Sequence, residues 1–145
     1  WAPRSVHEKT RRLAQAVREA ERKNGGQASD HQIAEELEVS LDEYHRLLAE
    51  TSCSQLLFLE DTGPEHEQEA IGGPEARLHD ERFRAALTDV IDQLPKKEKM
   101  VMALYYQEDM NLKEIGLVLE VSESRVSQIH SQALSRVRAK MGAWV

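Results

Sequence analysis

The sequence predicts an all-α protein of two small helical domains, each with a helix-turn-helix, joined by an acidic linker. Apolar residues recur at spacings of three and four, and residues typical of helix N-caps precede these runs. An internal repeat is the third observation, because residues 33–40 match residues 115–122, including the turn Leu-Glu-Val-Ser. We therefore expect one helix-turn-helix in each domain and little intrinsic affinity between the domains. The expected boundaries are 1–52, 53–74 and 75–145.

The first domain is expected to contain three helices. Pro3 suits the first turn of a helix, and Asn24-Gly25-Gly26 suits its end. Ser29 with Gln32 has the spacing of a capping box, in which each residue accepts a hydrogen bond from the backbone of the other. Ser40 and Glu43 have the same spacing. The expected helices span residues 3–23, 30–38 and 41–52.

Four helices are expected in the second domain. Leu94-Pro95 separates the first two, and a capping box of Asn111 with Glu114 begins the third. Ser122, a good N-cap residue, begins the fourth. These helices span residues 75–93, 96–106, 112–120 and 123–141. The last has a core stripe of Val126, Ile129, Ala133, Val137 and Met141.

The linker, residues 53–74, is acidic and rich in turn-forming residues, and helical periodicity stops at Cys53. A solvated tether is the simplest interpretation. His66 and His79 stand near its carboxylates, but they lack the fixed spacing of metal ligands, so we expect no metal.

The net charge of the chain is −7, which by itself argues against a nucleic-acid binder. The charge is unevenly distributed, however: residues 1–23 carry +4 and residues 122–145 carry +3, whereas residues 30–50 and 60–75 carry −6 each. Basic ends can contact DNA at two places, and the acidic middle can contact a basic partner.

Several protein classes are excluded by composition. No apolar run reaches the ~18 residues of a membrane span, and a single cysteine excludes an internal disulfide framework. We therefore expect a cytoplasmic protein without membrane contact. The chain shows no Ser/His/Asp triad, metal cluster or phosphate loop, so we expect neither an enzyme nor a cofactor.

The last helix carries the residues best suited to DNA. Opposite its core stripe lie short polar and basic side chains, which can bond base edges and phosphates in a major groove. The alternative is an ordinary solvated face. These side chains are Ser124, Arg125, Ser127, Gln128, Ser131, Ser135, Arg136, Arg138 and Lys140. The equivalent helix of the first unit is acidic and would be repelled by phosphate, so the basic helix from Arg4 onward is the candidate there.

The chain resembles bacterial σ factors of the flagellar, σ28-type group. The resemblance rests on L-P-K-K-E-K-M-V-M-A-L-Y-Y-Q-E-D-M-N-L-K-E-I-G and L-E-V-S-E-S-R-V-S-Q-I-H-S-Q-A-L-S-R-V-R, which resemble region 4. W-A-P-R-S-V-H resembles the start of region 3. The resemblance implies a C-terminal fragment, without the preceding σ domain that recognises the −10 element. It also places the acidic segment in the region 3–4 linker, which enters the polymerase.

The resemblance implies two sets of DNA-binding residues. The set expected at the −35 element is Glu123, Ser124, Arg125, Ser127, Gln128, Ser131, Arg136 and Arg138. Arg125 and Gln128 keep the residue types of primary σ factors, whereas Glu123 and Ser127 replace basic residues, which suits an alternative promoter class. The set expected upstream of the −10 element is Arg4, Ser5, His7, Glu8 and Arg11.

The implied function is that of a promoter-specificity subunit, with core RNA polymerase, promoter DNA and a flagellar anti-σ protein as partners. Two other hypotheses remain open. The chain could be a stand-alone helix-turn-helix regulator, although it shows no effector or dimerisation module. It could also be a protein-interaction fragment that an anti-σ factor binds, with DNA contact secondary.

Overall fold

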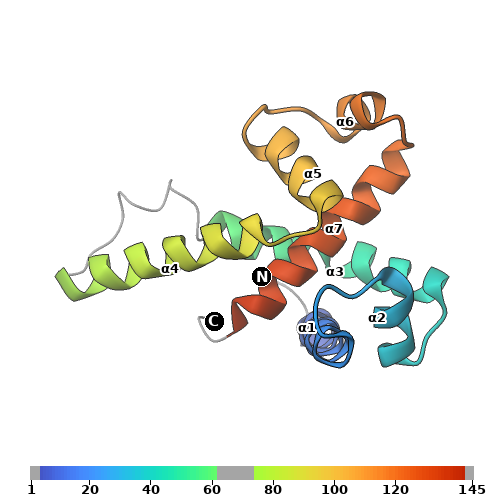
Figure 1. The fold of residues 1–145 in the computed structure, drawn as a ribbon, viewed down its shortest axis with the longest axis horizontal. Coiled ribbons are helices and arrows are strands. Elements are labelled where there is room, and N and C mark those ends of the chain that lie inside the picture. The colour runs from blue at the N-terminus through green and yellow to red at the C-terminus, as the bar shows by residue number, and fades with distance from the viewer. Residues whose placement is uncertain (1–3, 62–73, 143–145) are drawn as a thin grey trace.

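A computed structural model describes residues 4–61 and 74–142, and these residues form helices and turns with no strand among them (Figure 1). The predicted all-α class is confirmed. The helices are α1 (Arg4–Asn24), α2 (Asp30–Leu37), α3 (Leu41–Asp61), α4 (Pro74–Asp92), α5 (Lys96–Tyr106), α6 (Leu112–Leu119) and α7 (Glu123–Lys140). None of these described helices is both long and apolar enough to cross a bilayer.

The predicted caps form at the starts of α2, α6 and α7. Ser29 and Asn111 each complete a capping box with the residue three positions later, and the Ser122 side chain accepts a hydrogen bond from the Arg125 backbone N–H. Each box satisfies backbone N–H groups that a helix start would otherwise leave unpaired. This is why the sequence located these starts correctly.

The predicted end of α3 near Ser52 is wrong, because the helix continues to Asp61. No glycine or proline occurs between Leu41 and Asp61, and glutamine, leucine and glutamate are all good helix formers. Loss of a clear apolar period was therefore misread as the end of a helix. The remainder of the expected linker, residues 62–73, lies outside the described residues.

The internal repeat folds into the same turn twice. Glu38 after α2 and Glu120 after α6 both adopt the left-handed conformation, with φ of 59° and 60°. A side chain costs about 1 kcal/mol or more there, so two glutamates with one geometry indicate that the surrounding turn fixes the backbone. At Gly116 an added Cβ would lie 2.8 Å from the Val121 carbonyl oxygen, so this glycine permits the close turn.

Helix α7 is the centre of the molecule and packs on both halves of the chain (Figure 1). On one side Ala133, Leu134 and Val137 join a core with α4 and α5. On another side α1 and α3 lie against α7, and Ala139 belongs to the core formed by the first three helices. The expectation of little affinity between the two domains is therefore wrong, although their boundaries stay a prediction.

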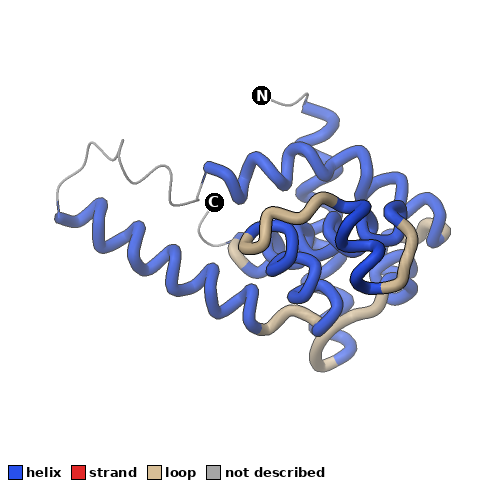
Figure 2. The backbone as a smooth tube through the Cα atoms, turned by 90° about the horizontal axis from the view of Figure 1, so that it is seen from above, coloured by secondary structure: helices blue, strands red, loops and turns tan. Residues whose placement is uncertain are grey.

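Helix α4 follows a different course from the rest. It projects away from the body that the other helices form, and both views show this (Figures 1 and 2). Its C-terminal half packs on α7 through Phe83, which is buried, and through partly buried Leu87 and Val90. The short link after Asp92 then leads into α5, so α4 anchors one end of α7.

Candidate nucleic-acid interface

The N-terminal half of α7 presents the residues predicted to read the −35 element. Glu123, Ser124, Arg125 and Ser127 are exposed and Gln128 is half-buried. Arg125 Nη1 donates a hydrogen bond of 3.3 Å to Gln128 Oε1, so the two residues with the greatest capacity to bond base edges lie side by side.

The C-terminal half of α7 is placed differently from the prediction. Ser131 is 3% exposed, Arg136 is 2% exposed, Ser135 is buried, and Arg138 and Lys140 are partly covered. The periodicity of one core stripe predicted an open opposite face. Here α1 and α3 cover that face, because α7 is packed on two sides. Ser131 and Arg136 therefore cannot contact a duplex in this arrangement.

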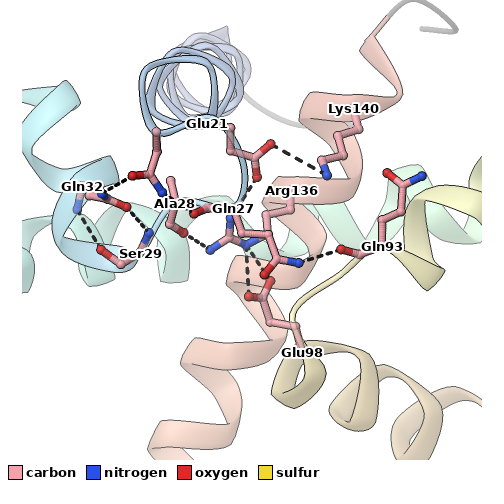
Figure 3. Close-up of polar contacts among 10 residues, drawn as sticks. Glu21, Gln27, Ala28, Ser29, Gln32, Gln93, Glu98, Arg136 and Lys140 are labelled. Carbon is pink, nitrogen blue, oxygen red and sulfur yellow. Dashed lines mark hydrogen bonds and ion pairs between the residues drawn. The ribbon is translucent and has the colours of Figure 1, made fainter.

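Arg136 is the hub of a buried polar cluster (Figure 3). Its Nε donates to both carboxylate oxygens of Glu98 on α5, at 2.9 and 3.0 Å. Its Nη1 donates to Glu21 Oε1 on α1 at 3.0 Å, and its Nη2 donates to the Ala28 carbonyl. Lys140 Nζ lies 3.8 Å from the other Glu21 oxygen. One guanidinium thus joins α7, α5, α1 and the loop before α2 through charge-assisted hydrogen bonds.

A second contact joins α2 to the start of α7. Asp30 Oδ2 lies 3.6 Å from Arg125 Nη1 and 3.2 Å from His45 Nε2. Burial raises the pKa of Asp30, but hydrogen bonds from Gln132 and His45 and the charge of Arg125 outweigh burial, so the pKa lies below its ordinary value. Asp30 is therefore an anion that faces the proposed base-reading arginine.

Two other buried groups titrate abnormally. Burial raises the pKa of Glu98 to about 7, with Arg136 opposing the rise and the charges of Asp30 and Glu21 adding to it. Burial lowers the pKa of His130 to about 4, and its Nε2 lies 3.1 Å from Tyr106 Oη.

A cleft of about 380 Å³ lies where the two halves meet. The loop before α2, the start of α5 and one face of α7 line it, and Asp30, Glu98, Arg125 and Arg136 are among its walls. Charges of both signs thus face the space. Within residues 4–61 and 74–142 no group of three His, Cys, Asp or Glu side chains gathers in a way that could hold a metal ion.

The set predicted to contact DNA upstream of the −10 element lies at the start of α1. Arg4, Ser5, His7, Glu8 and Arg11 are all exposed. Burial lowers the pKa of Arg138, and the positive charge of Arg11 lowers it further. Arg11 on α1 and Arg138 on α7 are therefore near each other, so the set predicted upstream of the −10 element lies close to the end of the −35 set.

Sequence reasoning missed the acidic partners of α7, which are Glu21, Asp30 and Glu98. Asp30 belongs to the acidic segment 30–50, for which the sequence suggested a basic partner, whereas Glu21 lies in the basic segment 1–23 and Glu98 lies in neither acidic segment. Nothing in the sequence indicated that this partner includes the basic helix of the same chain.

Comparison with known proteins identifies both halves of the chain. A family model for sigma-70 region 3 matches residues 8–70, and one for sigma-70 region 4 matches residues 90–139. The chain belongs to the sigma-70 family. It is 48% identical to the RNA polymerase sigma factor FliA of Pseudomonas aeruginosa, over 99% of this chain and 61% of that protein. It is 41% identical to FliA of Escherichia coli K12, over 98% of this chain and 63% of that protein.

The relationship extends to a sigma factor of Bacillus subtilis and to solved structures. The RNA polymerase sigma-D factor of Bacillus subtilis is 34% identical over 95% of this chain and 58% of its own length. The cocrystal structure of the flagellar complex Sigma-28/FlgM matches with a TM-score of 0.52 and 30% identity, over 97% of this chain and 62% of that chain. The chain spans about three fifths of the length of the curated relatives it matches.

Proposed function

We propose that this chain forms part of a promoter-specificity subunit of bacterial RNA polymerase that directs initiation at flagellar promoters. The observation that carries the proposal is the exposed, polar N-terminal half of α7 in the helix-turn-helix of a sigma-70 region 4. A helix of this kind fits a major groove, and its short polar groups and arginine can bond base edges.

Each predicted residue set receives a role in this proposal. Glu123, Ser124, Arg125, Ser127 and Gln128 read the −35 element, and Arg4, Ser5, His7, Glu8 and Arg11 contact the duplex upstream of the −10 element. Ser131, Arg136 and Arg138 serve as further contacts to the DNA backbone. Because Ser131 and Arg136 are buried here, their role requires α7 to separate from α1 and α3, and it also requires Arg136 to leave Glu98 on α5.

The proposed partners are core RNA polymerase, promoter DNA and a flagellar anti-sigma factor. FliA relatives are named as RNA polymerase sigma factors, and the solved neighbours are complexes of Sigma-28 with FlgM. The proposal gives the chain a binding role in the cytoplasm and no chemical step. No metal or cofactor takes part in it.

A selection from randomised duplexes tests the proposal. The chain, with and without core polymerase, is used to enrich a binding sequence, and Gln128→Ala and Arg125→Ala are then compared with the wild type. Loss of a base contact should cost about 1–3 kcal/mol on the enriched sequence and relax its preference at one position. Lys113→Ala, which removes an exposed cation of α6, is the control that keeps the preference.

Three outcomes would decide against the proposal. Equal sequence preference for wild type and Gln128→Ala would remove base reading from α7. Specific binding without core polymerase, and no co-purification with it, would favour a stand-alone regulator. Binding of an anti-sigma factor with no DNA preference at all would favour the interaction-fragment hypothesis.

A further inference from the structure

The cleft of about 380 Å³ between the two halves of the chain has the size of a small-molecule site. Such sites measure about 300–1,000 Å³ and combine apolar walls with a few polar groups. Ile129 on α7 supplies apolar surface, while Gln132 on the same helix and Asp30 at the start of α2 supply polar groups. Figure 3 shows Glu98 and the loop before α2 meeting at Arg136, which also lines the cleft. The size and the mixed lining of the cleft fit a small organic molecule.

The positive charges of the cleft are only partly neutralised. Asp30 and Glu98, the two carboxylates among its walls, each have an arginine partner on α7. Lys96 and Lys97 at the start of α5 are exposed, and within the described residues neither forms an ion pair or a hydrogen bond. The cleft therefore presents unpaired positive charge to an anion.

The start of α5 adds hydrogen-bond donors beside these lysines. Pro95 precedes the helix and provides no side-chain cap, so the first backbone N–H groups of α5 lack the acceptor that a cap would give. Such groups, together with the helix dipole, favour phosphate oxygens. Arg136 is 2% exposed and also has donors to spare, because Nη1 and Nη2 each bind one protein oxygen and each carry a second N–H. Several donors are thus available to an anion in the cleft.

A buried hydroxyl beside the cleft also has no partner. Tyr44 Oη is buried and, among the residues that the structure describes, has no hydrogen-bond partner. Burial raises the pKa of Tyr44, the charge of Asp30 raises it further and that of Arg136 lowers it, which places the hydroxyl near these two walls. Buried hydroxyls are nearly always hydrogen-bonded. The region therefore has more hydrogen-bonding capacity than the chain itself uses.

We propose that this cleft binds a nucleoside phosphate. Its phosphate groups lie at the start of α5, where Lys96 and Lys97 neutralise them, and two adjacent cations suit the multiple charge of a phosphate better than a single carboxylate. The base packs on Ile129, and its amino group donates to Asp30, whose carboxylate can accept more hydrogen bonds than it receives from Gln132 and His45. Neither lysine belongs to the residue sets proposed to contact DNA, so the site is additional to that function.

Isothermal titration of the whole chain with ADP, in phosphate-free buffer and without DNA, tests the proposal. ADP should bind in equimolar ratio, and pyrophosphate and adenosine should each bind more weakly because each makes only part of the contacts. No binding of ADP at millimolar concentration would overturn the proposal. Pyrophosphate binding as tight as that of ADP would exclude a contact with the base and would overturn it too.

A pair of double variants shows whether the two lysines hold the ligand. Lys96→Gln/Lys97→Gln should weaken ADP binding about tenfold or more, because it removes charge-assisted hydrogen bonds. Both side chains are exposed, so the variant keeps the fold, which a thermal melt checks. The matched control Arg46→Gln/Lys113→Gln removes the same charge from exposed positions outside the cleft and should change the affinity less than about twofold. An equal loss in both variants would reduce the binding to net charge and overturn the proposal.

Nuclear magnetic resonance locates the ligand on the chain. ADP should shift the backbone amide signal of Lys97 and the side-chain amide signals of Gln132, which lie in the cleft. Shifts confined to other parts of the chain would place ADP elsewhere and overturn the proposal. If the wild type binds no ADP and the lysine variant loses duplex binding, Lys96 and Lys97 serve DNA instead. The ADP measurements involve no DNA, so a failure of the proposed function would leave their outcome unchanged.

Discussion

Replacing Arg136 with methionine should lower the free energy of unfolding by about 3–5 kcal/mol at pH 8. The guanidinium donates two hydrogen bonds to the buried Glu98 carboxylate and one each to Glu21 and the Ala28 carbonyl. Methionine fills much of the same volume but donates to none of them. The cost is therefore that of leaving a buried anion without its counter-ion, rather than that of a cavity.

The free energy of unfolding lost in Arg136→Met should depend on pH. The raised pKa of Glu98 determines whether the loss grows or shrinks as the pH rises. Its pKa is raised to about 7 in the folded protein, so its contribution to stability is complete below its unfolded pKa and is lost as the pH rises through 7. In the wild type, the free energy of unfolding that Glu98 contributes falls by something on the order of 3 kcal/mol as the pH rises from below its unfolded pKa to above 7. Removing Arg136 raises the pKa further, so Glu98 stays protonated at pH 6 and the variant loses less stability there than at pH 8.

Urea denaturation followed by circular dichroism at pH 6 and pH 8 measures both effects. Arg46→Met, the same substitution at an exposed position of α3, is the control and should cost less than about 1 kcal/mol. Adding Glu98→Gln to Arg136→Met should abolish the pH dependence of the loss. An equal loss at both pH values, or a loss as small as that of the control, would refute the view that a buried carboxylate depends on Arg136.

Two further predictions concern α7 and its turn. The pKa of His130 is lowered to about 4, so its contribution to stability is complete above pH 6.5 and is lost as the pH falls toward 4. His130→Gln, which can still bond Tyr106, should reduce the acid-induced loss by something on the order of 3 kcal/mol in denaturation curves at pH 7 and pH 4. Gly116→Ala should lower the free energy of unfolding by about 1–2 kcal/mol in thermal melts, because the new Cβ would lie 2.8 Å from the Val121 carbonyl oxygen. A stability gain there would mean that helix propensity outweighs this contact.

Local chemistry made much of the fold predictable. Capping boxes at Ser29 and Asn111 and the break at Pro95 depend on neighbours within a few residues, and the helices begin where these signals predict. The spacing of Val126, Ile129 and Ala133 likewise identified one core face of α7. Such features can be predicted because they depend only on short stretches of sequence.

What could not be predicted depends on the packing of distant segments. Serine and arginine on a helix are usually exposed, so Ser131 and Arg136 were assigned to an open face. Both are buried because α1 and α3 cover α7; Arg136 finds its partners in Glu21 on α1 and in the Ala28 carbonyl of the loop before α2. The periodicity of one helix reveals its first buried face, but it does not show whether another segment covers the second.

The Arg136 contacts also set an order of events in folding. They join residues separated by 115 and 108 positions in the chain, whereas the two helix-turn-helix units are built from contacts between near neighbours. Bringing distant segments together costs loop-closure entropy before any contact repays it. We therefore expect the local units to form first and to dock last, once α7 has been synthesised. We expect the docked interface to be the slowest part of the molecule to form, which makes it a place where a partner can act during or after synthesis.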